Sequence, residues 1–374
     1  MTDDKLDADD VGDGDSEEAV AAASADALLP GADYSNADLT GRTLEGANLR
    51  ETHLRGANLQ GVNLQGADLS QTDLTGADLR GADLAGAILE NAGLNDADLS
   101  DAVLQGARLT GVRAARARFD RARLAECDLS GGDFRKARFQ RAVICTSDLA
   151  HAVLAGCDFT GADLEGSNLA SANLTQAVLI AARMIGANLT AAILVEADLS
   201  EVDLSSANLS QVSATGVVLR GTNLASANLR FADLSAARLE KVNAPQANFE
   251  RAALMRARIV HCSASQATWE FAGLRGAELC DSKFTDGNFV GVEWDQATAT
   301  RCDFTRADFF WSDFERLRVD ACITLEARLP VKSGVAFGPK DDKAPAVPRL
   351  PLHRTAMNGE QRQACLEILQ DRGT

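Results

Sequence analysis

A bulky apolar residue recurs every five residues through most of this chain. Steps of five from Tyr34 to Leu329 give sixty positions, and fifty-four of them carry a bulky apolar side chain, most often leucine. A small residue, usually alanine, lies two positions earlier, as Ala67 does before Leu69. No insertion interrupts the register, so we predict that residues 32–329 form one repetitive structure. The positions that break the pattern are Ala114, Ala214, Ala244, Ala264, Ala299 and Thr324.

A five-residue period fits neither a regular helix nor a plain strand. Around an α-helix, leucines five apart would point about 140° away from one another and form no stripe. Along a strand they would alternate between the two faces, because side chains alternate every two residues. The period is satisfied if the chain turns within every five residues. The small and the bulky residue then both point inward, and the other three point outward and carry the turn. Asp and Asn, which often precede the bulky residue, suit such turns because their side chains bond to nearby backbone.

Motifs such as Ala37-Asp38-Leu39-Thr40-Gly41 and Ala172-Asn173-Leu174-Thr175-Gln176 resemble the A(D/N)LxX signature of the pentapeptide-repeat family. The resemblance covers residues 32–329, about four fifths of the chain. It implies an all-β solenoid: a right-handed β-helix of square (quadrilateral) cross-section, with four pentads to a coil. Sixty pentads then make about fifteen coils, and a spacing of about 4.8 Å per coil gives a rod about 70 Å long.

In that geometry, residues twenty positions apart lie on top of one another. This rule predicts three aromatic stacks inside the rod: Phe249, Trp269, Phe289 and Phe309; Phe119, Phe139 and Phe159; and Trp294 on Phe314. We interpret all of them as core packing and not as a cofactor site.

The two ends of the chain depart from the repeat. We predict a disordered acidic tail over 1–15 and a short helix over 16–31 that caps the first coil. Residues 330–352 hold five of the seven prolines and are predicted to be a linker. Residues 353–374 are predicted to form an amphipathic C-terminal helix that docks on another surface, because an isolated helix of this length is marginal.

The compartment can be predicted from apolar stretches and cysteines. No stretch approaches the roughly 20 apolar residues that cross a membrane, and the acidic start lacks the apolar core of a secretory signal. We interpret the eight cysteines as reduced, so we expect a cytoplasmic protein. Five of them fall at the small inward position, where a thiol acts as a small buried hydrophobe: Cys127, Cys157, Cys262, Cys302 and Cys322.

The net charge of −17 is unevenly distributed. Residues 1–31 hold ten acids and one Lys, whereas residues 106–141 hold ten bases and four acids. Successive pentads occupy successive sides, so the bases of 106–141 should form a collar around the rod. Its two interpretations are a solvated surface neutralised by acidic neighbours, which we favour, and a dedicated anion site. The collar consists of Arg108, Arg113, Arg116, Arg118, Arg121, Arg123, Arg135, Lys136, Arg138 and Arg141.

No motif in the chain indicates catalysis or cofactor binding. The four histidines are far apart, and none has the spacing of a metal-binding pair. Nucleophile-elbow, phosphate-loop and dinucleotide-binding motifs are absent from the sequence. We therefore predict that the protein is not an enzyme and that it uses no cofactor or metal.

Aromatic residues at outward positions form the clearest departure from the repeat. Phe231, Phe271 and Trp311 should share one outward column, with Val290 and Phe310 in the column beside it. An exposed apolar patch usually marks an interface. The patch either binds a partner chain, including a second copy in a homodimer through the C-terminal region, or is covered by the protein's own linker and helix.

Three functions follow from these features. The first is a non-enzymatic protein-binding scaffold, one version of which serves a bacterial secretion or toxin system. The alternative, implied by the resemblance, is an acidic rod that mimics DNA, binds DNA gyrase or topoisomerase and protects against quinolones. A basic collar that interrupts the acidic surface argues against mimicry. The third, direct nucleic-acid binding through the collar, is disfavoured because exposed aromatics are not interleaved with its arginines.

Overall fold

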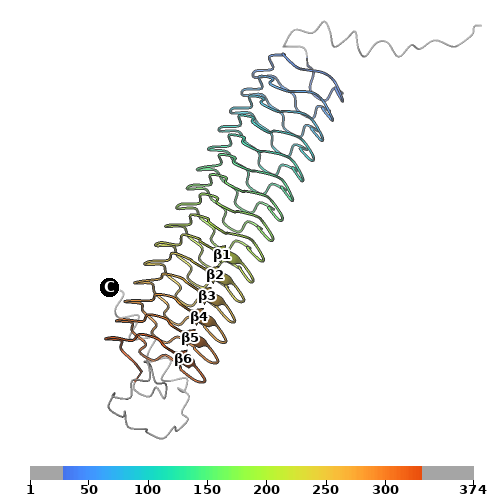
Figure 1. The fold of residues 1–374 in the computed structure, drawn as a ribbon. Coiled ribbons are helices and arrows are strands. Elements are labelled where there is room, and N and C mark those ends of the chain that lie inside the picture. The colour runs from blue at the N-terminus through green and yellow to red at the C-terminus, as the bar shows by residue number, and fades with distance from the viewer. Residues whose placement is uncertain (1–27, 331–374) are drawn as a thin grey trace, which may run out of the picture.

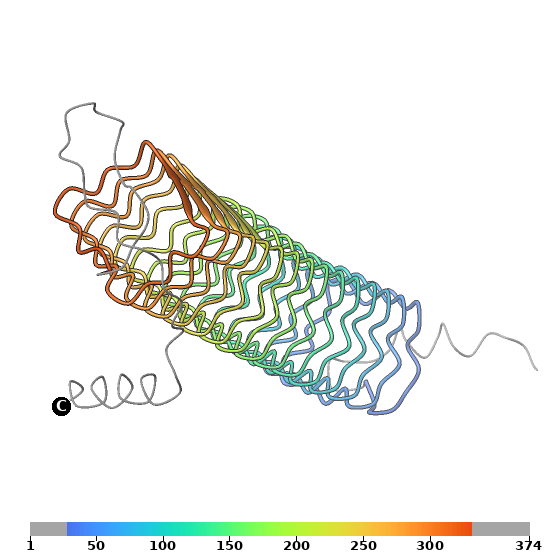
Figure 2. The same cartoon turned by 90° about the horizontal axis from the view of Figure 1, so that it is seen from below.

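The computed structural model describes residues 28–330, which wind into a single parallel β-helix (Figure 1). Backbone bridges join each outward residue to the residue twenty positions later, from Asp33↔His53 through to Asp308↔Arg328. Four such bridges occur in every twenty residues, so each coil has four sides built from four pentads. The predicted β-solenoid with a four-pentad coil is therefore confirmed. At twenty residues per coil, the bridges between Asp33 and Arg328 span about fifteen coils, and Figure 2 shows them stacked along one axis.

Regular strands form on only one side of the rod, over its last five coil-to-coil steps. They form a six-stranded parallel sheet in the order β1-β2-β3-β4-β5-β6, labelled in Figure 1. Elsewhere the coils pair through single-residue bridges. We call this side, whose bridge residues run from Asp38 to Arg318, the sheet side. The strands are β1 Val218–Arg220, β2 Arg238–Glu240, β3 Arg258–Val260, β4 Glu278–Cys280, β5 Thr298–Thr300 and β6 Arg318–Asp320.

Each pentad contains one tight turn that restores its inward and outward pattern. The backbone N–H of the small residue donates to the carbonyl of the preceding bulky residue, as Ala57 does to Leu54 at 3.1 Å. The second residue after each bulky one has a positive φ, from Gly31 to Glu326, as in the third position of a type II turn. Glycine fills only twenty of these sixty positions; even the β-branched Thr146 stands at φ 56°. Left-handed backbone costs an L-residue about 1–2 kcal/mol, so coil-to-coil pairing must hold these turns in place.

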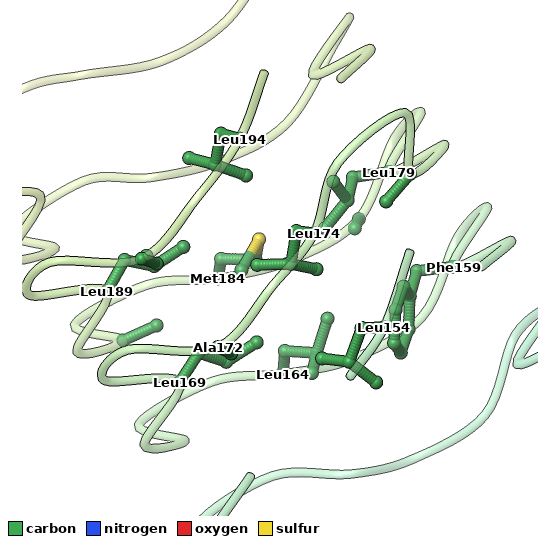
Figure 3. Packing of buried hydrophobic residues seen from close by; sticks show 14 of the residues in the cluster. Leu154, Phe159, Leu164, Leu169, Ala172, Leu174, Leu179, Met184, Leu189 and Leu194 are labelled. Atoms are coloured by element: carbon green, nitrogen blue, oxygen red, sulfur yellow. The ribbon is translucent and has the colours of Figure 1, made fainter. Parts of the chain in front are cut away.

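The two inward residues of each pentad form a continuous core along the rod. Figure 3 shows how Leu154, Phe159 and Leu164 point into it from one coil and Leu174, Leu179 and Met184 from the next. The longer aromatic stack is confirmed: Trp269 lies nearly parallel to Phe249, with ring centroids 4.0 Å apart, and to Phe289 at 5.7 Å. Phe309 continues this stack at 5.2 Å from Phe289.

The shorter stack is also confirmed, and the third prediction needs a correction. Phe139 lies 4.8 Å from both Phe119 and Phe159, with interplanar angles of 4° and 5°. Trp294 and Phe314 are neighbours, as predicted, but they meet edge to face at 74° with centroids 6.3 Å apart. Phe314 is in the last coil described, where it also meets Phe309 edge to face at 68°. Stacked and edge-to-face contacts are both favourable for aromatic rings. The register therefore determined which rings meet but not how they are oriented.

Polar residues at the small inward position bond to the backbone of the preceding coil. The Ser147 hydroxyl donates to the carbonyl of Leu124 at 2.6 Å and accepts from the N–H of Cys127 at 3.1 Å, so it inserts into that turn. The Cys322 sulfur takes the same place next to Cys302: it accepts from the Cys302 N–H at 3.3 Å and approaches the Ala299 carbonyl at 3.4 Å. These two thiols are stacked neighbours, as the twenty-residue register requires, and both are free of disulfides. All five inward cysteines are buried, as predicted.

The described residues leave apolar side chains exposed at both ends of the rod. At the first coil Leu29 is 64% exposed, and at the last coil Ile323 and Leu325 are 55% and 64% exposed. Of the predicted helix 16–31, residues 28–31 are described, and they lead into a turn at Pro30 and Gly31. The predicted tail 1–15, the rest of that helix, nearly all of the linker 330–352 and the helix 353–374 lie outside the described residues. No helix long and apolar enough to cross a membrane occurs within residues 28–330.

Candidate protein-binding surface

Outward aromatic side chains gather along one corner of the rod in its C-terminal third. Phe231, Phe271 and Trp311 occupy the positive-φ position of their turns, at φ 60°, 56° and 59°. No other Phe, Tyr or Trp stands at such a position among residues 28–330, and all three share the column defined by the twenty-residue register. Val290 and Phe310 precede that column by one residue. We call these five residues the aromatic corner; it spans four coil steps, about 19 Å.

Arginines are interleaved with the rings of the aromatic corner. The guanidinium of Arg251 lies 5.5 Å from the ring centroid of Phe231 and 5.8 Å from that of Phe271, so it bridges two coils. Arg230 lies 5.6 Å from the Phe231 ring. Arg328 lies 4.1 Å from the Phe310 ring. Such cation–π contacts hold the rings in place, and each of these three arginines is also within ion-pair distance of a carboxylate of the rod.

The rings also use the small residues of neighbouring coils. Phe271 lies over Gly291: a Cβ added there would come within 2.6 Å of two atoms of the ring. Because Gly291 also has a φ of 68°, a larger residue at this position would be strained and would displace the ring. Phe310 and Trp311 stack on each other with centroids 4.5 Å apart. Phe231 is 45% exposed, and the other members of the corner are half-buried.

The side of the rod next to the aromatic corner is smooth. Its outward residues at the level of Phe231 to Phe271 include Ala253 and Gly273, and a Cβ added at Gly273 would meet no atom within 4 Å. Met255, 47% exposed, follows at the next turn. A partner can therefore approach the backbone of this side closely while it contacts the rings, which is what an interface core requires.

The basic collar is largely neutralised in place. Arg116 and Arg121 each form a two-pronged ion pair with the aspartate twenty residues earlier, Asp96 and Asp101 respectively. These guanidinium groups hold the pKa of both aspartates below the usual value. The same pattern favours the interpretation of the collar as a solvated, paired surface.

Some of the other basic residues of the collar form ion pairs with carboxylates and some do not. Arg118 and Arg138 both reach the buried carboxylate of Asp120, each at 3.4 Å. Other carboxylates within ion-pair distance are Asp133 for Arg135 and Glu90 for Arg108. Among residues 28–330, no carboxylate lies within ion-pair distance of the other three arginines or the lysine, namely Arg113, Arg123, Arg141 and Lys136.

Sequence reasoning missed the cations of the aromatic corner. Arg251 lies twenty residues after Phe231 and twenty before Phe271, so the register alone places it in their column. The twenty-residue rule, applied to outward residues as it was to the core, would have placed it between the two rings. The smooth side at Ala253 and Gly273 carries the same signal, a pair of small residues twenty apart at an outward position.

The described residues show little that could support chemistry. Within residues 28–330 no three His, Cys, Asp or Glu side chains are grouped to hold a metal ion. A cavity inside the rod, between core leucines such as Leu209 and Leu219, has room for no more than a single water molecule. What the surface offers is rings, guanidinium groups and exposed backbone.

The sequence was compared with models of known protein families. The model described as "Pentapeptide repeats (8 copies)" matches most of the rod, in overlapping stretches. This chain belongs to the pentapeptide-repeat family. No curated protein matches this pentapeptide-repeat chain significantly. The matched stretches are residues 25–56, 32–71, 67–106, 102–141, 147–184, 172–211, 182–221, 203–240, 232–268 and 277–316.

Several solved structures are similar to this pentapeptide-repeat chain. HetL, a pentapeptide repeat protein involved in heterocyst differentiation regulation from the cyanobacterium Nostoc sp. strain PCC 7120, is 26% identical over 70% of this chain and 93% of its own, with a TM-score of 0.26. A pentapeptide repeat protein from the Arabidopsis thaliana thylakoid lumen is 34% identical over 28% of this chain and 65% of its own, with a TM-score of 0.17. QnrB1, a plasmid-mediated fluoroquinolone resistance protein, is 21% identical over 57% of this chain and 91% of its own, with a TM-score of 0.24.

Proposed function

We propose that this pentapeptide-repeat rod is a non-enzymatic scaffold that binds another protein through its aromatic corner. The observation that carries the proposal is the alignment of Phe231, Phe271 and Trp311 in one outward column with Arg251 between two of the rings. Aromatic and arginine side chains supply most of the binding energy at protein interfaces, and here both lie on a rigid element. A reducing compartment, the cytoplasm, fits the proposal because the buried thiols are unpaired.

Positive φ makes this arrangement costly to maintain. Each of the three aromatic residues stands in left-handed backbone, where glycine or asparagine would be at least as stable. Core packing does not require these rings, because they lie outside the rod. Most turns of this rod hold a non-glycine residue at positive φ, so the backbone alone does not mark these positions. What marks them is that aromatic rings occupy the positive-φ position in this one column only, among residues 28–330.

We expect the variant Phe310→Ser with Trp311→Ser to lose its partner. The two stacked rings and the Arg328 contact would be removed together. In affinity purification from the native host, followed by mass spectrometry, recovery of the specific partner should fall at least about tenfold, an effect of the size that interface hot spots show. A matched control is Val143→Ser with Ile193→Ser, which removes two exposed apolar side chains (38% and 39% exposed) elsewhere on the rod.

Two further readouts separate the alternatives for the aromatic corner. Light scattering after size exclusion would show whether the double variant changes oligomeric state, which would identify a second copy of this chain as the partner. An unchanged melting temperature is expected if the partner is another chain. Equal recovery by both variants, or a fall of many degrees in melting temperature, would overturn the proposal; the latter outcome would mean that the protein's own C-terminal segment covers the surface.

DNA mimicry is the second candidate, and the acidic N-terminal coils favour it. Residues 32–105 hold twelve acids and only four arginines. The collar, however, neutralises the upper part of this surface, because Asp96, Asp98 and Asp101 each lie within 3.3 Å of a collar arginine. A duplex carries about one negative charge per 1.7 Å along its whole length, and these paired coils depart from that pattern.

A gyrase supercoiling assay discriminates between the two functions. We expect the protein to leave gyrase supercoiling unchanged at micromolar concentration, because its acidic surface is interrupted after about four coils. A variant with Arg116→Gln and Arg121→Gln, which frees Asp96 and Asp101, is the control for charge continuity. Inhibition by the unmodified protein would establish mimicry in place of the scaffold function.

A further inference from the structure

A second charged surface lies on the sheet side, one side of the rod away from the aromatic corner and several coils beyond the collar. Arg238 in β2 and Arg258 in β3 are register partners on adjacent coils, and both are exposed. Arg256 lies two residues before Arg258, at the turn that leads into β3, and is also exposed. We call these three residues the arginine patch. Like charges directly opposite each other on neighbouring strands destabilise a sheet, so this pair needs a reason.

The collar shows how this rod normally resolves such a pair. Arg118 and Arg138 are also register partners on the sheet side, and the carboxylate of Asp120 lies 3.4 Å from each of them. Glu240 stands at the position in the arginine patch that corresponds to Asp120 in the collar. Its carboxylate is instead 3.2 Å from Arg220 on the preceding coil. The carboxylate that could compensate Arg238 and Arg258 is therefore paired with another arginine.

The other neighbours of the arginine patch also leave it uncompensated. Arg116 of the collar pairs with Asp96 twenty residues earlier, whereas the residue twenty before Arg256 is Ala236. On the following coil Arg256 extends towards Gly276: its Cγ lies 3.6 Å from where a Cβ there would stand. The register neighbour of Arg258 on that coil is Glu278. Among residues 28–330, neither Glu278 nor any other carboxylate lies within ion-pair distance of the arginine patch.

The surroundings add the positive charge of Lys241, and Glu278 is the nearby acid outside the ion pairs of residues 28–330. Lys241 and His261 stand at the turns that follow β2 and β3. Asp281, the nearest acid beyond them in that column, is held by Arg301 in a two-pronged ion pair at 2.6 and 2.7 Å. Up to three guanidinium groups therefore present their donors to solvent over two adjacent coils.

We propose that the arginine patch is a binding site for an acidic peptide segment. Guanidinium groups recognise carboxylates through paired N–H donors, and arginines on coils about 4.8 Å apart can reach carboxylates of nearby residues on an extended peptide. A nucleic-acid duplex fits less well, because its closely spaced phosphates exceed the charge that three arginines neutralise and the net charge of −17 repels the rest. The occupant is an acidic segment of another protein, in keeping with the proposed scaffold function on which this inference rests. The chain's own residues 1–18, which hold nine acids and one lysine, are the alternative that the test separates.

The test measures binding of a fluorescein-labelled decaglutamate peptide to the full-length protein by anisotropy at low salt. Replacing Arg238, Arg256 and Arg258 by Gln should weaken binding about tenfold, and moderate salt should weaken binding to the unmodified protein. The matched control replaces Arg55, Arg123 and Arg318 by Gln. These three arginines are also exposed and outside the ion pairs of residues 28–330 but are dispersed, so this variant has the same net charge and should bind as the unmodified protein does.

Three further measurements complete the test. The melting temperature of the patch variant should be unchanged or slightly higher, because a like-charge pair is removed. Replacing the acids of residues 3–18 by amides, in the unmodified protein and in the patch variant, separates the two sources. A gain in decaglutamate binding that requires the patch arginines identifies the chain's own segment as the occupant, whereas an equal gain in both backgrounds reflects net charge alone and supports another protein. The proposal is overturned by equal loss of binding in the patch and control variants, or by tighter patch-dependent binding of a 20-base-pair DNA duplex than of the peptide.

Discussion

Deleting the single residue Ala170 should disrupt the middle of the rod, whereas deleting all twenty residues 170–189 should leave a folded, slightly shorter rod. Ala170 is the first turn residue after Leu169, and without it four residues would have to cover a step that needs five. Leu174 and the residues after it would then point outward, or the turn would be lost. Mispositioning even two buried leucines costs about 3–6 kcal/mol at about 1.5–3 kcal/mol each.

The twenty-residue deletion preserves every contact type. Asn168, which now pairs with Asn188, would pair with Asn208, and the turn after Leu169 would continue with Thr190 and Ala191. Because solenoid stability adds coil by coil, the unfolding enthalpy should fall by about one fifteenth and the melting temperature by only a few degrees. Circular dichroism melts and calorimetry of both deletions provide the comparison. Equal destabilisation by the two deletions would show that twenty-residue stacking is not what holds the rod together.

Truncating Trp269 to alanine should be the most damaging single substitution in the C-terminal coils. Trp269 is sandwiched between Phe249 and Phe289 and meets Phe284 edge to face at 5.9 Å. Removing a buried aromatic of this size costs about 3–5 kcal/mol, because the rings on both sides are fixed by their own coils and cannot fill the cavity. Chemical denaturation of the full-length protein measures the loss as a shift in midpoint.

Two companion variants sharpen this prediction. The indole N–H of Trp269 is buried without a hydrogen-bond partner among the described residues. Trp269→Phe removes that unsatisfied donor while it keeps the stack, so its stability should lie within about 1 kcal/mol of the unmodified protein. Trp311→Ala removes the same side chain from the surface and should also cost less than about 1 kcal/mol. If Trp269→Phe is as damaging as Trp269→Ala, the ladder does not explain the stability of these coils.

The fold and the core stacks were predictable because a single period controls them. If five residues make one side and four sides make one coil, then Phe249, Trp269 and Phe289 must lie above one another inside the rod. The ring orientation of Trp294 against Phe314 did not follow, because register fixes which residues meet but not the torsion angles of their side chains. The positive φ at every turn was also missed, since glycine or asparagine signals it in only some of the pentads.

The positions of the candidate surface residues could be predicted, but the contacts among their side chains could not. The column of Phe231, Phe271 and Trp311 follows from counting in twenties, whereas Arg251 becomes part of the site only through where its guanidinium lies. The pairing of two collar arginines with Asp96 and Asp101 follows from the same register. Arg238 and Arg258 resemble the collar pair in sequence, and one reason that they remain unpaired is that the carboxylate of Glu240 pairs with Arg220.

By itself, the five-residue period determined that the chain turns within every pentad and which residues point inward, because an apolar side chain is stable only in the dry interior. The four pentads per coil, and with them the stacking partners twenty residues apart, came from the resemblance to the family. The tertiary structure decided which outward charges neutralise one another and which remain available. An exposed side chain can choose among neighbours two, eighteen or twenty residues away at nearly equal energy, and only the arrangement in space shows which neighbour it takes.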